Sequence, residues 1–99
     1  MSGERRITKR SAFPMPVRYQ QKSSQVFSNT LGRDISETGI GFVSSEFFPI
    51  STQLVFETQH PENRNFIKVA GEVMWVSKYP HSERFSVGAR FLGPLLPLS

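Results

Sequence analysis

Residues 66–77 read FIKVAGEVMWVS, and their side chains alternate between the two sides of an extended chain. Alternation with a period of two residues is typical of a β-strand with one buried face. Residues 85–92 read FSVGARFL and alternate in the same way. Between the two stretches, residues 79–83 contain Pro80 and His81, which favour a turn. The two stretches therefore predict two antiparallel strands joined by a turn.

Four shorter segments rich in Val, Ile and Phe precede this pair, and helical periodicity is nearly absent from the chain. They span residues 16–20, 26–35, 40–44 and 52–58. Six short strands leave two open edges unless the sheet closes, so we predict an all-β protein, a six-stranded antiparallel β-barrel. Gly93, Pro94 and Pro97 leave no room for a substantial C-terminal helix. Strand parity predicts a core of Val17, Ile35, Ile40, Phe42, Leu54, Phe56, Val69, Val73, Trp75, Val87 and Phe91.

The composition narrows the classes of protein to which the chain can belong. Its 99 residues are enough for one core, and its 37% hydrophobic and 20% charged residues predict a folded chain without membrane insertion. The absence of cysteine excludes disulfides, thiolate metal sites and a cysteine nucleophile, and it favours a cytoplasmic location.

Charge is distributed unevenly along the chain. Residues 1–33 hold seven basic residues and one acidic residue, whereas residues 34–99 hold five basic and seven acidic residues. Residues 1–12 contain little apolar surface with which to offset the entropy cost of ordering. We therefore predict a flexible basic arm at residues 1–12 and a single barrel domain at residues 13–99, and we expect the arm to meet phosphate.

The arm carries two arginines four residues apart, Arg6 and Arg10, with Arg5 directly before them. The planar donor fork of a guanidinium matches guanine O6 and N7, or two phosphate oxygens. The same residues also fit a solvated tail or a nonspecific polyanion-binding segment, and spacing alone does not separate these interpretations.

The second group of residues is Asp34, Ser36 and Gly39, at the end of a predicted strand. Asp34 and Ser36 are expected to project side by side from one face, where a carboxylate can accept guanine N–H donors and a hydroxyl can reach phosphate or sugar. Gly39 lets the backbone bend and a ligand approach closely. An ordinary turn, in which Asp34 binds its own backbone, is the alternative.

Together the two groups resemble the PilZ domain family of cyclic di-GMP receptors, whose hallmarks are Arg-x-x-x-Arg on an N-terminal arm and Asp/Asn-x-Ser-x-x-Gly on the barrel. The segments GFVS (41–44), GEVMWV (71–76) and VGARF (87–91) resemble the family's later strands in order and spacing. The resemblance covers nearly the whole chain. It implies a split-barrel fold and a second-messenger receptor.

In this resemblance, Arg6 and Arg10 bind guanine Hoogsteen edges and phosphates, Asp34 accepts the guanine imino and amino donors, and Ser36 and Gly39 line the phosphate and sugar. Arg5, directly before the first motif, implies an intercalated pair of cyclic di-GMP molecules, and a single bound molecule is the alternative. With no effector domain in the chain, output is expected through a partner protein in trans after the arm closes.

Arg33 and Trp75 are two further candidates for the site. In a regular strand Arg33 would point inward, so a bulge near Gly32 or an exposed strand end is expected to free it for an anion site. Trp75 shares parity with Val69 and Val73, which favours the core, although an exposed indole would suit a guanine.

Other assignments remain as alternatives or are disfavoured. His60 and His81 have no further metal-binding side chain at ligand spacing, so we predict no metal site and no cofactor. No histidine lies near Ser36 in sequence to activate its hydroxyl, so we predict no catalytic residue and expect that the protein is not an enzyme. The rival functions are a single-stranded nucleic-acid-binding barrel and a PilZ-like adaptor without ligand; we expect no nucleic acid polymer. The cluster at 47–50 either caps the barrel or binds a partner, and the tail at 92–99 either packs on the barrel or docks on a partner.

Overall fold

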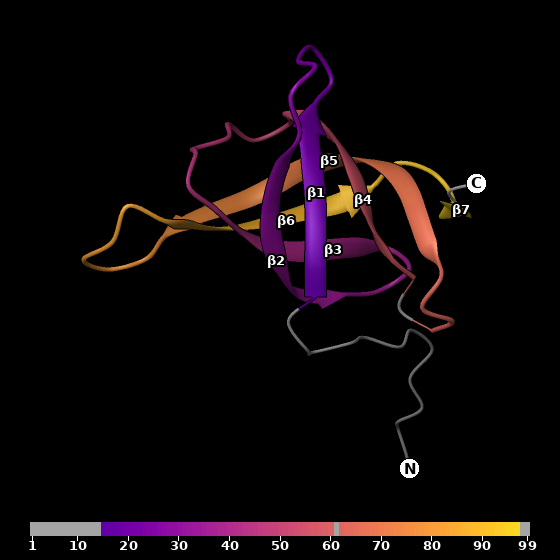
Figure 1. Cartoon of the computed structure of the whole chain (residues 1–99). Coiled ribbons are helices and arrows are strands. Elements are labelled where there is room, and N and C mark those ends of the chain that lie inside the picture. The colour runs from indigo at the N-terminus through magenta and orange to yellow at the C-terminus, as the bar shows by residue number, and fades with distance from the viewer. Residues whose placement is uncertain (1–14, 61, 98–99) are drawn as a thin grey trace.

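The computed structural model describes residues 15–60 and 62–97, and all regular structure in them is β-strand. The strands are short segments of Val, Ile, Phe and Leu separated by Gly, Pro, Ser and Asn, which break extended structure. Figure 1 shows them wrapping around a common centre. Their bounds are β1 Met15–Gln21, β2 Ser28–Ile35, β3 Gly39–Ser44, β4 Gln53–Gln59, β5 Phe66–Lys78, β6 Phe85–Phe91 and β7 Leu96–Pro97.

The sheet closes into a barrel because β5 is long enough to pair with several neighbours. The strand order is β4-β1-β2-β3-β6-β5-β7, and a further pairing of β4 with β5 joins the ends. Every pairing is antiparallel. The predicted six-stranded antiparallel barrel is therefore confirmed. The short β7 is an addition that the sequence did not reveal.

The predicted core is confirmed at ten of its eleven positions, and Trp75 is the exception. The other ten side chains are buried, with Ile35, Phe42, Leu54, Phe56, Val73 and Val87 at 0% exposure. Trp75 is 47% exposed because the register of β5 against β6 shifts between Val73 and Trp75. This bulge inserts one residue and reverses the direction of the side chains that follow it. The prediction that Trp75 lies in the core is therefore wrong.

The two apolar segments outside the predicted strands partly cover the barrel. Phe48 is buried and packs edge-on against Tyr19 at 5.7 Å, whereas Phe47 and Ile50 stay exposed. The C-terminal tail packs on the barrel, which was one of the two alternatives, because β7 pairs with Ile67 and Lys68 of β5. In residues 15–60 and 62–97 there is no helix that could span a membrane and no group of side chains that could hold a metal ion.

Candidate functional site

Four residues on the outer face of the barrel lie in one row across four strands. Asp34 on β2 pairs with Gly41 on β3, Gly41 pairs with Gly88 on β6, and Gly88 pairs with Trp75 on β5. Asp34 and Trp75 therefore stand three strands apart, about 14 Å between backbones at roughly 4.8 Å per strand. The two positions between them carry no side chains.

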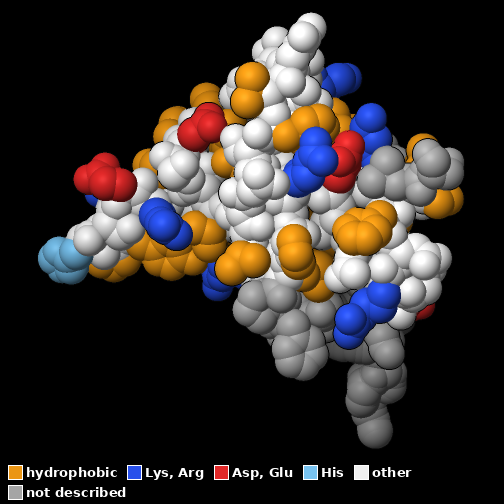
Figure 2. All heavy atoms as spheres, in the orientation of Figure 1, with side chains coloured by type: hydrophobic (Ala, Val, Ile, Leu, Met, Phe, Trp, Pro, Cys, Tyr) orange, Lys and Arg blue, Asp and Glu red, His pale blue; other side chains and the backbone are white. Residues whose placement is uncertain are grey.

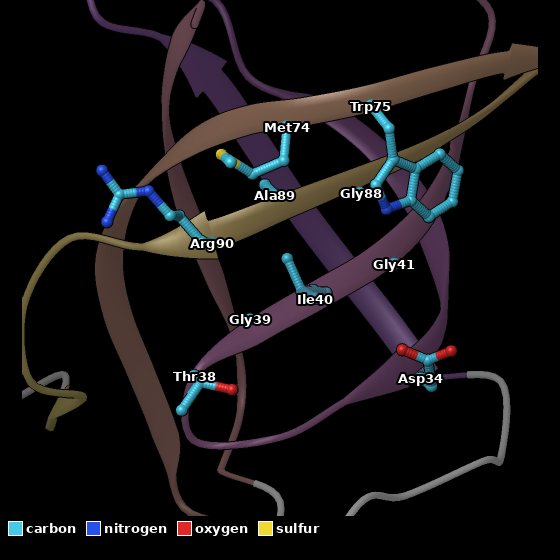
Figure 3. Close-up of a pocket in the computed structure, with 10 residues that line it drawn as sticks. All are labelled: Asp34, Thr38, Gly39, Ile40, Gly41, Met74, Trp75, Gly88, Ala89 and Arg90. Atoms are coloured by element: carbon cyan, nitrogen blue, oxygen red, sulfur yellow. The ribbon is translucent and has the colours of Figure 1, made fainter. Parts of the chain in front are cut away.

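The two glycines restrict this arrangement to different degrees. A Cβ atom at Gly88 would lie 2.2 Å from Nε1 and Cε2 of Trp75, so the indole rests directly on the Gly88 backbone. A Cβ atom at Gly41 would lie 3.3 Å from Oδ1 of Asp34. Figure 3 shows the indole and the carboxylate on the same side of the sheet, one at each end of the glycine pair. The indole thus lies low on the sheet over Gly88, and the carboxylate lies beside Gly41.

This row is part of a hollow of about 270 Å³ on the outer face. Met74, which ordinary strand alternation after the buried Val73 points outward, forms a second wall and is 47% exposed. Arg90 lies at the rim, where its Nη2 and Nε donate to Oε1 of Glu72 at 2.8 and 3.2 Å. The lining residues are Asp34, Thr38, Gly39, Ile40, Gly41, Met74, Trp75, Gly88, Ala89 and Arg90.

The turn between β2 and β3 is closed by Ser36, which is not among the residues that line the hollow. The Ser36 amide donates to the Gly39 carbonyl at 3.0 Å, and its hydroxyl accepts from the Thr38 amide at 3.2 Å. Ser36 is 0% exposed. The expectation that Ser36 stands beside Asp34 on the surface is therefore wrong, because β2 ends at Ile35 and the chain turns inward there.

Gly39 lines the hollow, and packing between strands requires glycine there. No glycine within residues 15–60 and 62–97 has a positive φ, so backbone conformation does not demand it. A Cβ atom at Gly39 would lie 2.6 Å from the backbone oxygen of Ala89 on β6. Close approach of β3 to β6 is therefore what excludes a side chain.

Arg33 reaches the outer face through the bulge that its sequence position suggested. The register of β2 against β3 shifts between Gly32 and Asp34, and Arg33 is exposed. Its Nη1 donates to Oγ of Ser86 on β6. The expected bulge near Gly32 is confirmed, and it places a guanidinium on the same face of the barrel as Asp34.

The opposite side of the barrel is built differently. Arg18, Glu57 and Lys68 lie in register across β1, β4 and β5, and Arg18 Nε is 3.7 Å from Glu57 Oε1. Figure 2 shows basic and acidic side chains interspersed on the face that carries β1. A carboxylate thus lies between these two cations and weakens the attraction of that face for anions.

The family model described as "PilZ domain" matches residues 4–96. The chain belongs to the PilZ domain family. This is a family of cyclic di-GMP receptors, whose domains bind ligand and do not catalyse.

A solved structure with the same fold is that of the Bacillus subtilis inhibitor of motility, MotI/DgrA. It is 22% identical, with a TM-score of 0.72, over 92% of this chain and 44% of that chain. The likeness shows the PilZ barrel fold, and the chain spans less than half of that relative's length. A search of curated proteins gave no match.

Of the two motifs of the PilZ signature, the structure describes Asp-x-Ser-x-x-Gly and does not describe Arg-x-x-x-Arg. Asp34 and Gly39 line the hollow, and Ser36 lies buried behind it. Arg5, Arg6 and Arg10 lie outside the described residues, so their predicted contacts stay predictions.

Sequence reasoning missed Gly41, Gly88, Met74 and Thr38 as parts of the site. The glycines carried a signal, because both occupy outward positions in the middle of predicted strands. Glycine weakens a strand unless another group approaches its backbone closely. Two such positions on neighbouring strands could have marked the floor of a binding surface.

Proposed function

We propose that this PilZ domain is a receptor that binds cyclic di-GMP on its outer face, with Asp34 and Trp75 as the two ends of the site. The observation that carries the proposal is the row in which a carboxylate and an indole face one another across Gly41 and Gly88. Because the glycines let the indole lie low on the sheet, a planar base can stack on its exposed side and still come within reach of the carboxylate.

Each end of the row offers a different interaction to a guanine. The Asp34 carboxylate accepts hydrogen bonds from guanine N1–H and N2–H, and such bonds to a charged group contribute about 1.5–3 kcal/mol each. The exposed indole offers a stacking surface, which contributes about 1–3 kcal/mol per base. A dissociation constant of about 1 μM corresponds to a binding free energy of about −8 kcal/mol. The hydrogen bonds and the stacking together supply a large part of that free energy.

The arginines of the signature complete the proposed site. We assign Arg6 and Arg10 to the guanine O6 and N7 atoms and to the phosphates, which a guanidinium fork fits. Arg5 would serve a second, intercalated ligand molecule. Ser36, being buried, is assigned to holding the turn that presents Asp34 and Gly39 and not to the ligand itself.

We also propose that the closed complex is recognised by a partner protein in trans, in the cytoplasm. The support is that the hollow lies on an outer face of a small barrel, so that ligand and arm would together form new surface there. The partner and its pathway stay outside the proposal.

Isothermal titration calorimetry with cyclic di-GMP tests the proposed function. We expect Asp34→Ala and Arg10→Ala each to lower the affinity at least about tenfold, the equivalent of losing one charge-assisted bond. Glu37→Ala is the matched control, because it removes an exposed carboxylate from the same turn without touching the hollow. Urea unfolding of each variant separates lost contacts from lost folding.

Unchanged affinity in Asp34→Ala would refute the assignment of the site. A single-stranded oligonucleotide serves as the competing probe, because its affinity should fall by about 0.7 log units per log unit of salt for each phosphate contacted. Tight oligonucleotide binding with such a slope, and no binding of the dinucleotide, would favour the nucleic-acid function instead.

A further inference from the structure

Arg33 and Ser86 form a contact on the outer face that the proposed function leaves without a role. The bulge between Gly32 and Asp34 turns Arg33 outward from β2. Its guanidinium then reaches past β3 to β6, where Nη1 donates to Oγ of Ser86. Ser86 lies in register with Val43 on β3, so the arginine side chain crosses the outer face of that strand.

Ser86 is well placed to hold the arginine. It is only 7% exposed, and a buried hydroxyl needs a hydrogen-bond partner. Arg33 is the partner that the structure gives it among the described residues. The contact therefore fixes the end of a long side chain that would otherwise sample many rotamers.

The held guanidinium lies close to the indole end of the site. Ser86 and Gly88 share the outer face of β6 two residues apart, about 6.8 Å at 3.4 Å per residue, and Trp75 rests on Gly88. The sugar of a nucleotide bridges a separation of this kind between its base and its phosphate. A base stacked on Trp75 would thus have a phosphate within reach of Arg33.

We propose that Ser86 is a positioning residue that holds Arg33 beside Trp75, so that the guanidinium binds a phosphate of the stacked nucleotide. The inference rests on the proposed function and assigns that site a phosphate-binding cation from the barrel itself. The bond to Ser86 uses one of several guanidinium donors, which leaves others for phosphate oxygens. Because the side chain is already ordered, less conformational entropy is lost on binding.

A double-mutant cycle measured by calorimetry with cyclic di-GMP tests this. We expect Arg33→Ala to lower the affinity about tenfold and Ser86→Ala about threefold, because the latter keeps the charge but releases it. In the Arg33→Ala background, Ser86→Ala should change nothing further. Ser86→Thr keeps the hydroxyl and should restore the wild-type affinity.

The salt dependence and two matched controls complete the design. Arg33→Ala should flatten the dependence of affinity on sodium chloride, whereas Ser86→Ala should leave it unchanged. Ser77→Ala, at the position paired with Ser86 on β5, and Arg18→Ala, which removes the same charge from the opposite side, should have no effect.

Two results would overturn the inference while leaving the proposed function intact. One is wild-type affinity in Ser86→Ala, and the other is an equal effect of Ser86→Ala with and without Arg33, which would show a role independent of the arginine. Failure of the wild-type protein to bind cyclic di-GMP at all would instead overturn the proposed function, and the inference with it.

Discussion

The neighbouring strands β3 and β6 carry large side chains on their inner face and several glycines on their outer face. On the inner face the central positions are filled and buried, with Ile40, Phe42, Val87 and Ala89 in the core. On the outer face Gly39, Gly41 and Gly88 carry no side chains, so that the indole from β5 lies directly on Gly88 and the carboxylate from β2 lies beside Gly41. The inner face stabilises the barrel by filling volume, whereas the outer face gains a site by leaving volume empty. Stability and binding should therefore respond to different substitutions on the same strands.

The largest expected effect comes from emptying the inner face. Phe42 is 0% exposed, and its ring lies 5.2 Å from that of Tyr19 and 5.3 Å from that of Phe56. Phe42→Ala should lower the free energy of unfolding by about 3–5 kcal/mol, through lost burial and the cavity that remains. Urea denaturation followed by circular dichroism measures this. A loss below about 1 kcal/mol would mean that the barrel interior is not the core described here.

The same truncation on the outer face should separate the two properties. Trp75→Ala removes a side chain that is 47% exposed, so the free energy of unfolding should change by less than about 1 kcal/mol. Cyclic di-GMP affinity should fall by about five- to 150-fold, the equivalent of losing one stacked base. Trp75→Phe retains an aromatic face and should recover part of the affinity. If Trp75→Ala destabilises the barrel as Phe42→Ala does, the contrast between the faces fails.

Trp75 also shows where strand periodicity loses its power to predict. The alternation of residues 66–77 placed the strand correctly, and the bulge after Val73 then reversed the face without disturbing the apolar pattern. A tryptophan suits either face, so nothing in the sequence conflicted with the wrong assignment. Arg33 was different, because a guanidinium at an inward position is costly to bury. That conflict predicted the bulge near Gly32 correctly.

The binding turn illustrates a second limit of the sequence. Asp34, Ser36 and Gly39 could be found from the motif, and Asp34 and Gly39 do line one hollow. The side chain of Ser36 turns inward because β2 ends one residue before it, and strand ends are not fixed by composition to within one residue. Its hydroxyl accepts a hydrogen bond from the Thr38 amide. This is an ST-type turn, which the sequence Ser36-Glu37-Thr38 is equally able to form.

The smallest expected effects come from adding a single methyl group at one of the outer glycines. These substitutions test most closely whether stability and binding depend on different faces of the sheet. In Gly88→Ala the new Cβ would meet the indole at 2.2 Å, so Trp75 must lift from the sheet. Because Trp75 is an exposed side chain free to move, stability should stay within about 1 kcal/mol while affinity falls about three- to tenfold.

Gly41→Ala is the matched control on the neighbouring strand, because its Cβ would approach Asp34 Oδ1 only to 3.3 Å and a small shift of the carboxylate relieves the contact. Calorimetry should therefore show an affinity change below about threefold, a free-energy difference of roughly 0.6 kcal/mol or less. The order of the two substitutions is the informative result. If Gly41→Ala weakens binding more than Gly88→Ala, the ligand lies against the Asp34 end of the row, and stacking on the indole is not what holds it.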